Sequence, residues 1–232
     1  MKNTVELIDW YGGDKAIARA AWTSTQIDVE SKSDERIRDL IVNRLWNNKT
    51  GKPHKTPFER GVVEFNVTCD VATHIHIIKH RHANVNGESA RYKELKEDKY
   101  YLPEDWGDIG NSCDAGNSLR GFCKYEQPWV YWLEEYTKLG NELYHRCIED
   151  LEPVLGRKRA KESARYFKTY NSQITLSVMM NMSCFSNFHH LRSASDAQLE
   201  VREVANEMWR LISEIPEEPF KFTLEAFEAS KS

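Results

Sequence analysis

The chain has 232 residues, and its apolar content of 40%, with 7 Trp, 10 Tyr and 9 Phe, is enough to build the core of one large domain or two small ones. Its net charge of −4 argues against bulk, sequence-independent binding to nucleic acid polymers, which requires an excess of basic residues. Residues 1–6 lack the apolar centre of a signal peptide, and no apolar run approaches the roughly 18 residues of a membrane span.

The 5 cysteines are odd in number and widely spaced, at Cys69, Cys113, Cys123, Cys147 and Cys184, and no Cys-x-x-Cys occurs. This pattern argues against a disulfide framework and a structural zinc. It favours a reducing, cytoplasmic location.

The first third of the chain predicts two helices and a strand. Residues 14–21 are expected to form a short helix with Asp14 as its cap. Ser33 caps a second helix, in which apolar side chains recur at helical spacing at Ile37, Leu40, Ile41 and Leu45. Residues 63–69 alternate apolar and polar side chains, which indicates a half-buried strand.

Asp70 is expected to cap a helix from Val71 to about His82. Residues 103–124 are rich in Gly, Asn, Asp and Ser without any period, which predicts a surface loop. Pro128 suits the first turn of a long helix. The buried side of that helix is expected to consist of Trp129, Leu133, Tyr136, Leu139, Leu143 and Cys147.

Residues 158–167 predict another helix, and residues 175–182 favour a strand over a buried helix. Ser195 and Gln198 form a capping-box pattern before the last predicted helix, which Pro216 and Pro219 end. The apolar side chains of that helix are Leu199, Val204, Ala205, Met208, Leu211 and Ile212. The expected fold class is therefore α+β with helices in the majority.

Residues 79–92 concentrate cationic, amide and hydroxyl side chains in one short segment. We expect this segment to run from a helix into a Gly-containing loop. Their cations can neutralise phosphate, their amides and hydroxyl can donate directional hydrogen bonds, and their glycine lets the backbone approach a ligand closely. The residues are Lys79, Arg81 and Arg91, then Asn84, Asn86 and Ser89, and Gly87. In an acidic protein, such a local basic site suggests a nucleotide or a cofactor phosphate as the ligand.

Two other interpretations remain open for the histidines at positions 74, 76, 80 and 82. One is a metal site, although the spacing lacks the companion Glu of His-Glu-x-x-His and no Cys pair follows. The other is a solvated helix face.

The segment also resembles a family signature. His80-Arg81, 7 residues (82–88) and Ser89 are similar to the hallmark of the flavin-dependent thymidylate synthases, which is Arg-His-Arg, 7 residues and Ser. Lys79 stands in place of the first Arg.

Further segments follow the same family in order and at compatible spacing between residues 21 and 202. Residues 54–59 resemble its His-x-Ser/Thr-Pro-Phe-Glu element, and residues 21–24 resemble Ala-Arg-x-Ser with Trp22 in place of Arg. Residues 164–166 resemble the element with a nucleotide-binding Arg. Asn181, Asn187 and Arg192, followed by residues 197–202, complete the series. Each residue alone could serve as an ordinary loop, cap or surface residue, but the ordered set favours the family.

The resemblance implies a mixed α/β, helix-rich single domain over residues 1–232 with a central antiparallel or mixed sheet, assembled as a homotetramer with shared active sites. It implies formation of dTMP from dUMP, with methylenetetrahydrofolate as carbon donor, FAD as hydride carrier and NADPH as reductant. No Gly-x-Gly-x-x-Gly is present, so cations and amides must replace the usual dinucleotide cradle.

The resemblance also implies roles for individual residues. FAD would be held by Ser24, Thr56, Lys79, His80, Arg81, Asn181 and Asn187. The substrate dUMP would be held by His76, Ser89, Ala90, Arg91, Arg165 and Arg192. Arg192 is the catalytic candidate, because a fixed cation at the uracil ring stabilises charge as the ring becomes nucleophilic. We expect no metal, no cysteine in a basic pocket and hence no cysteine nucleophile.

Three positions depart from the family pattern. Gly87 stands where the family usually has Glu or Gln, Ser183 where it has an Arg that helps hold the flavin, and Asp196 where His is common. The change at Ser183 predicts weaker FAD binding. The departures leave room for an enzyme that hydroxymethylates or otherwise modifies a pyrimidine nucleotide, or for an inactive nucleotide- or flavin-binding homologue. A structural helical domain with incidental His and Arg is the remaining alternative.

Overall fold

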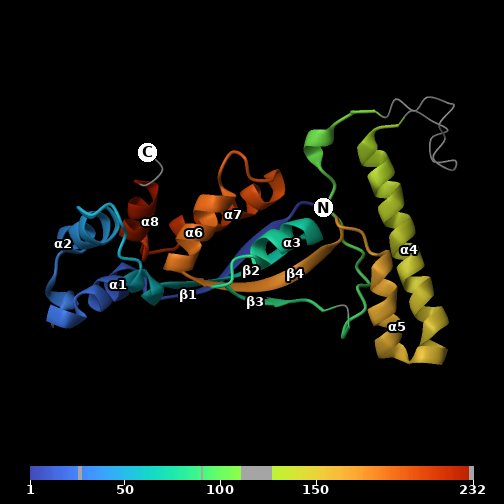
Figure 1. Cartoon of the computed structure of the whole chain (residues 1–232), viewed down its shortest axis with the longest axis horizontal. Coiled ribbons are helices and arrows are strands. Elements are labelled where there is room, and N and C mark those ends of the chain that lie inside the picture. Colours follow the sequence, from blue (N-terminus) through green and yellow to red (C-terminus); the bar gives the residue numbers. More distant parts are fainter. Residues whose placement is uncertain (26–27, 90, 111–126, 230–232) are drawn as a thin grey trace. The chain divides into compact units, whose positions relative to one another are not determined.

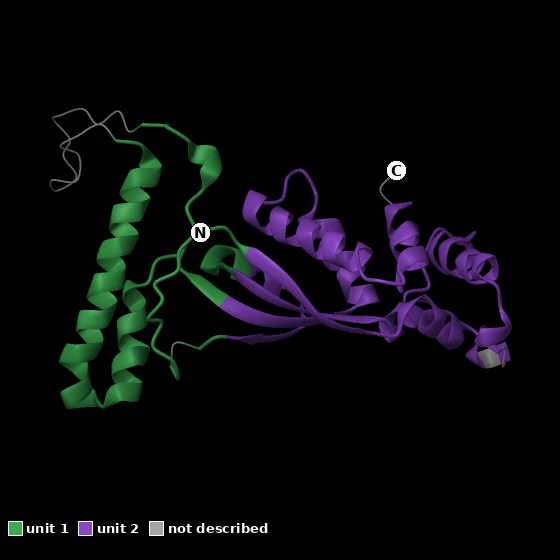
Figure 2. Ribbon diagram, turned by 180° about the vertical axis from the view of Figure 1, so that it is seen from behind, with its two compact units in different colours: residues 1–3, 69–74, 88–174 green, residues 4–68, 75–87, 175–232 purple. Residues whose placement is uncertain are grey.

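The computed structural model describes residues 1–25, 28–89, 91–110 and 127–229 (Figure 1). Contacts divide the chain into two compact units (Figure 2). Unit 1 comprises residues 1–3, 69–74 and 88–174, and unit 2 comprises residues 4–68, 75–87 and 175–232. Helices accompany a four-stranded sheet, which confirms the predicted mixed, helix-rich fold class. The single domain over residues 1–232 stays a prediction.

The sheet has the strand order β1-β2-β4-β3. Its strands are β1 (Thr4–Tyr11), β2 (Val62–Asp70), β3 (Asn84–Gly87) and β4 (Gln173–Asn181). β1 pairs with β2 and β3 with β4, both antiparallel. The predicted strands at residues 63–69 and 175–182 are confirmed as β2 and β4. Alternate residues of β2 are fully buried, as its sequence pattern indicates.

Unit 2 contributes most of the helices around the site. They are α1 (Gly13–Ala21), α2 (Asp34–Arg38) with its π-helical continuation Asp39–Trp46, α6 (Met182–Arg192), α7 (Leu199–Ser213) and α8 (Lys221–Glu228). Short 3-10 helices occur at Thr23–Thr25, Val29–Ser31 and Thr56–Arg60. α6 packs against α7 and against the 3-10 helix Thr56–Arg60, and these contacts place one face of α6 beside the loop before that helix.

The helix α3 (Val71–Ile78) begins in unit 1 and ends in unit 2. Asp70 caps it as predicted, since its carboxylate accepts hydrogen bonds from the Thr73 backbone N (2.9 Å) and Oγ1 (2.7 Å). The helix ends at Ile78 rather than near His82. Turn hydrogen bonds from His80 N to Ile77 O and from Ala83 N to His80 O replace helical ones.

Unit 1 is built on α4 (Trp129–Leu155) and α5 (Arg157–Ala164), with short 3-10 helices at Glu104–Trp106 and Arg165–Phe167. Its core contains Tyr144 and Ile148 from α4 and Ala160 and Ala164 from α5. The predicted loop at residues 103–124 lies partly outside the described residues. In the described part of the chain, no helix is both long enough and apolar enough to cross a membrane.

The predicted buried side of α4 was wrong for most of its members. Tyr136 is 57% exposed and Leu139 is 43% exposed, and Trp129 and Leu143 are also exposed. The helix instead buries Thr137, Gly140, Asn141, Tyr144 and Ile148. Partners distant in sequence are the reason. A Cβ at Gly140 would lie 2.6 Å from Phe167 O, so the chain packs closely there, and the Thr137 hydroxyl donates to Asn171 Oδ1 at 3.1 Å.

Two predicted caps also differ. Gln198, not Ser195, precedes α7, and no side-chain capping hydrogen bond forms there, so the capping box was wrong. Asp14 does not cap its own helix, which begins at Gly13. Its carboxylate accepts hydrogen bonds from Phe222 N (2.7 Å), Thr223 N (3.0 Å) and Thr223 Oγ1 (2.6 Å), and thereby caps the start of α8.

This buried cap predicts a pH dependence of stability. Burial raises the pKa of the Asp14 carboxyl from 3.8 to about 6, although hydrogen bonds from Thr223 and Phe222 oppose the rise. The folded chain then holds this proton more tightly than the unfolded chain does. The free energy of unfolding should therefore fall as the pH rises from about 4 to about 6, by about 3 kcal/mol if the whole pKa change is expressed.

Urea unfolding of the wild type and of Asp14→Asn across this pH range checks the prediction. The variant should lose the dependence because an amide does not titrate, whereas Asp108→Asn, which changes an exposed residue, should keep it. Parallel curves for the wild type and Asp14→Asn would contradict it.

Candidate functional site

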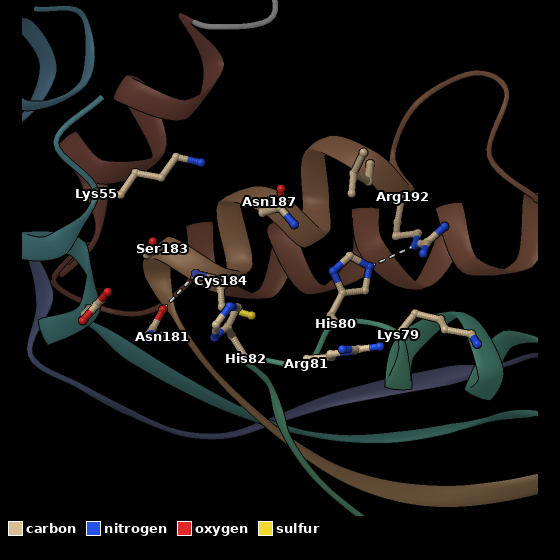
Figure 3. A pocket seen from close by; sticks show the side chains of 12 residues that line it. Lys55, Lys79, His80, Arg81, His82, Asn181, Ser183, Cys184, Asn187 and Arg192 are labelled. Carbon is tan, nitrogen blue, oxygen red and sulfur yellow. Dashed lines mark hydrogen bonds between the residues drawn. The ribbon is translucent and has the colours of Figure 1, made fainter. Parts of the chain in front are cut away.

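Unit 2 contains a cavity of about 600 Å³ that we call the basic pocket (Figure 3). Three parts of the chain line it: the segment at residues 55–59, the turn that follows α3, and the face of α6. The lining residues are Lys55, Glu59, Lys79, His80, Arg81, His82, Asn181, Ser183, Cys184, Asn187, Leu191 and Arg192.

The basic pocket carries a surplus of positive charge. Lys55, Lys79, Arg81 and Arg192 contribute cations, and Glu59 is its acidic residue. Among the residues that the structure describes, none of these four cations has a carboxylate within ion-pairing distance. Cations that lack acidic partners and face one cavity favour an anionic ligand such as a phosphate or diphosphate.

The cation Arg192 is oriented by His80. Arg192 Nε donates a hydrogen bond to His80 Nε2 at 3.0 Å (Figure 3). Since Nε2 accepts, the ring of neutral His80 carries its proton on Nδ1. The bond uses Nε alone, so the two terminal NH₂ groups of Arg192 remain for a ligand.

His80 is held neutral by its surroundings. Its residue is 8% exposed, and its ring packs edge-to-face on Phe188 with the centroids 4.9 Å apart. Burial, and secondly the charge of Arg192, lower the pKa of His80 from 6.5 to about 4. A neutral ring can accept from the guanidinium, whereas a protonated ring would repel it.

The junction between β4 and α6 places the amides. Asn181 ends β4 and is the N-cap of α6, with its Oδ1 accepting from Cys184 N at 2.8 Å. Ser183, Asn187 and Leu191 follow at intervals of four residues, so they share one face of the helix, the face that lines the basic pocket.

The residues predicted to hold FAD fall into two places. The basic pocket contains Lys79, His80, Arg81, Asn181 and Asn187. Thr56 lines a separate cavity of about 670 Å³, together with His54 and Arg60. Ser24 belongs to the 3-10 helix Thr23–Thr25, and its side chain lies outside the described residues.

The residues predicted to hold dUMP are dispersed over both units. Arg192 lines the basic pocket, and His76 Nε2 lies 3.0 Å from Oε1 of Gln198. In unit 1, Arg91 Nε donates to Glu162 at 2.6 Å, and Ser89 Oγ accepts from Arg91 N at 3.4 Å. Arg165, also in unit 1, is exposed, and Ala90 lies outside the described residues. These binding roles stay predictions.

One expectation about cysteine was wrong. Cys184 lines the basic pocket, although the sequence suggested that no cysteine would lie in such a site. Burial raises the pKa of its thiol, so the protonated form persists and nucleophilic attack by this residue is disfavoured. Burial likewise raises the pKa of Cys69, to about 12.

Sequence reasoning missed several lining residues that flank those it found. Lys55 and Glu59 belong to the recognised element at residues 54–59, and His82 directly follows Arg81. Leu191 lies four residues after Asn187, so helical spacing within α6 could have found it.

Gly87 was predicted to lie in a loop, but this prediction was wrong, because Gly87 ends strand β3. It pairs with Leu176 of β4, and a Cβ at this position would approach Leu176 Cδ2 to 2.9 Å. A Glu or Gln here therefore requires the leucine side chain to move. Glycine at position 87, where the family usually has Glu or Gln, thus fits the close packing of the Leu176 side chain in this chain.

Comparisons with known proteins agree on one family. The sequence model described as "Thymidylate synthase complementing protein" matches residues 6–217. A flavin-dependent thymidylate synthase of Rickettsia typhi is 31% identical over 97% of this chain and 75% of its own length. The protein of the same description from Thermotoga neapolitana is 28% identical over 97% of this chain and 91% of its own length.

A solved structure agrees with the fold. The UMP/dUMP methylase PolB from Streptomyces cacaoi, bound with 5-Br dUMP, superposes with a TM-score of 0.74 at 27% identity, covering 98% of this chain and 95% of that one. The same protein bound with 5-Br UMP gives a TM-score of 0.72 at 26% identity.

The state of His80 can be measured directly. Because burial and Arg192 lower its pKa to about 4, its ring should not titrate between pH 5 and pH 8. Carbon-13 histidine NMR, with the resonance assigned by a His80→Gln variant, checks this. Arg192→Gln should raise the pKa only in part, because burial is the larger cause. A midpoint near 6.5 in the wild type would contradict the assignment.

Proposed function

The chain is an enzyme of the thymidylate synthase complementing protein family, which includes the flavin-dependent thymidylate synthases, and we propose that it forms dTMP from dUMP. In this proposal methylenetetrahydrofolate is the carbon donor, FAD the hydride carrier and NADPH the reductant. The observation that carries it is the basic pocket, where segments that resemble the family signatures bring together cations without acidic partners among the described residues.

The residues of the basic pocket fit a flavin dinucleotide. A volume of about 600 Å³ lies within the roughly 300–1,000 Å³ usual for ligand pockets. Lys55, Lys79 and Arg81 supply charge for a diphosphate, and the exposed amide of Asn187 can bond to a polar ring edge or a ribityl hydroxyl. When bound, FAD would supply the hydride chemistry. The protein would orient the flavin against the substrate and polarise the reacting groups.

Arg192 is proposed as the catalytic residue. Its terminal NH₂ groups would donate to the uracil carbonyl on which negative charge develops. His80 acts as a positioning residue, since its Nε2 holds Arg192 Nε at 3.0 Å. Preorganisation of this kind avoids reorienting the guanidinium during the reaction.

Arg91 and Arg165 of unit 1 are proposed as partners of the dUMP phosphate. Arg91 already pairs with Glu162, but its side chain is 45% exposed. An exposed ion pair contributes only about 0–1 kcal/mol, so a phosphate dianion can compete for the guanidinium at small cost. Ser89 is assigned to binding, because no base is hydrogen-bonded to its hydroxyl among the described residues.

The proposed assembly is a homotetramer with shared sites. The exposed apolar side chains of α4, including Tyr136, Leu139 and Leu143, form a surface that a second copy of the chain can cover. A cytoplasmic location likewise remains a prediction, based on the cysteine pattern.

A second candidate function is methylation of UMP as well as dUMP. It is favoured by the similarity to PolB, whose structures are described with 5-Br dUMP and with 5-Br UMP. The two candidates differ in whether the ribose 2′-hydroxyl is tolerated. Supplying each nucleotide separately to the same enzyme preparation distinguishes them.

The function is tested with purified protein, FAD, NADPH and methylenetetrahydrofolate. We expect a visible flavin band that NADPH bleaches in the presence of dUMP, and dTMP as the product identified by mass spectrometry. A methylated UMP product would support the second candidate, and a hydroxymethylated product would support a different pyrimidine modification. Absence of flavin binding under all conditions would overturn all three.

Arg192→Ala should keep flavin binding but lower turnover roughly 100- to 1,000-fold, the loss typical of removing one donor to a developing oxyanion. The matched control is Arg202→Ala, which removes a guanidinium bonded to the Ser195 carbonyl outside the basic pocket. Stopped-flow spectra separate flavin reduction from product formation. Wild-type turnover in Arg192→Ala would remove this residue from its catalytic role.

Light scattering after gel filtration tests the assembly. The wild type should have about four times the chain mass of 27.1 kDa. The double variant Leu139→Glu, Leu143→Glu should have a smaller mass, because charges on a buried interface are costly. Glu142→Gln, an exposed change on the same helix, serves as control. A monomeric wild type would refute the tetramer.

A further inference from the structure

Lys161 of α5 is a buried lysine without a carboxylate partner among the described residues. It is 8% exposed, and its one hydrogen bond in the described part of the chain runs from Nζ to the Tyr92 carbonyl oxygen, at 2.8 Å. An ammonium has three donors, so this bond leaves two of them. Burying such a group beside a single carbonyl oxygen costs free energy, and a nearby anion would reduce that cost.

The carbonyl that Lys161 binds belongs to a turn that contains Ser89, Arg91 and Tyr92, which we call the Ser89 turn. Tyr92 N donates to Ser89 O at 3.1 Å, and Arg91 N donates to Ser89 Oγ at 3.4 Å. The turn thus carries Ser89 and Arg91, two of the residues proposed to hold dUMP. The bond from Lys161 fixes this turn to α5 directly beside them.

The same stretch of α5 leads to the second cation proposed for the phosphate. Arg165 lies one helical turn after Lys161, because its backbone N donates to Lys161 O at the end of α5. Glu162, the next residue after Lys161, accepts a hydrogen bond from Arg91 Nε at 2.6 Å. Two consecutive residues of α5 therefore hold the Ser89 turn, and Arg165 follows one turn later.

The chain after the Ser89 turn is held by other contacts with α4, which lies side by side with α5 (Figure 1). Leu95 N donates to the Tyr144 hydroxyl at 3.1 Å, and the carboxylate of Glu94 lies 3.0 Å from His145 Nδ1. These contacts do not involve Lys161. Loss of the Lys161 bond should therefore loosen the Ser89 turn without detaching the segment that follows it.

We propose that Lys161 is a positioning residue for the nucleotide phosphate. Its ammonium fixes the Ser89 turn against α5, so that Arg91 and Arg165 bind one phosphate, and its unpaired charge adds to the field that attracts a dianion. This inference rests on the proposed function and adds a residue that does not itself touch the substrate. Preset cations bind more tightly because the turn loses little freedom when the nucleotide binds.

The test compares the wild type with Lys161→Met, Lys161→Arg and the control Lys158→Met. Lys158 is exposed on the same helix, so the control removes the same charge from a site open to solvent. Formation of dTMP at saturating FAD, NADPH and methylenetetrahydrofolate gives kcat and the KM for dUMP. Competitive inhibition by inorganic phosphate gives the affinity for a phosphate alone.

Lys161→Met should raise both the KM for dUMP and the inhibition constant of phosphate about tenfold, the effect of losing one hydrogen bond of a charged group. Its kcat should stay within about twofold of the wild type, because the groups at the uracil ring are unchanged. Lys161→Arg should recover most of the affinity, since a guanidinium can also donate to the Tyr92 carbonyl. Lys158→Met should keep both constants.

An unchanged KM and phosphate inhibition in Lys161→Met would overturn the positioning role and leave the proposed function intact. A joint loss of kcat and FAD binding that Lys161→Arg does not recover would show a role in folding alone and would also overturn it. An equal rise of KM in Lys158→Met would reduce the effect to net charge, with the same consequence. A wild type that binds no flavin and forms no dTMP would overturn the proposed function itself.

Discussion

The hydrogen bond from Arg192 to His80 is the constraint on which the site depends. It joins the turn after α3 to the last turn of α6, across 112 residues of sequence. The bond requires a neutral histidine, and burial against Phe188 provides one. Apolar packing keeps the ring neutral, the hydrogen bond from Arg192 fixes its tautomer, and the same bond orients the guanidinium, which lines the basic pocket. The packing of His80, its protonation state and the orientation of Arg192 therefore depend on one another.

Arginine side chains form ion pairs on the surface of this molecule but lack acidic partners in the described part of the basic pocket. Arg210 lies between Glu207 and Glu214 on the surface of α7, where its charge is neutralised by the protein. Arg192 and Arg81 face a cavity without such neutralisation among the described residues. Gathering like charges without partners destabilises a fold. This chain pairs many of its other cations with carboxylates. An anionic ligand that neutralises the cations of the basic pocket best explains why these are left unpaired.

Local patterns predicted those parts of the fold that depend on nearby residues. Alternation identified β2, and the Asp70 cap correctly placed the start of α3. Strand β3 has no such signal, because four mostly polar residues become a strand only through pairing with β4. β1 was missed because its alternation of apolar and polar residues breaks at Leu7 and Ile8, where the register with β2 shifts.

The site, like the fold, was predicted only in part from the sequence. Resemblance to family elements located His80 and Arg192, but their hydrogen bond and the resulting state of the ring required the fold. Cys184 and Lys55 entered the basic pocket through the positions of α6 and the loop before the Thr56–Arg60 helix, which no spacing in the sequence specifies. The buried face of α4 was also set by a distant partner, the carbonyl of Phe167 beside Gly140.

The cap that Asp14 provides to α8 has a consequence for how the protein is made. Donor and acceptor are separated by 208 residues, so a ribosome must synthesise nearly the entire chain before this contact can form. The sheet has the same property, because β1 is made first and β4 emerges much later. Unit 2 therefore cannot finish folding until the segments up to α8 have been synthesised. Until β4 is synthesised, strand β2 lacks its neighbour on one side, and such an unpaired edge can pair with other chains.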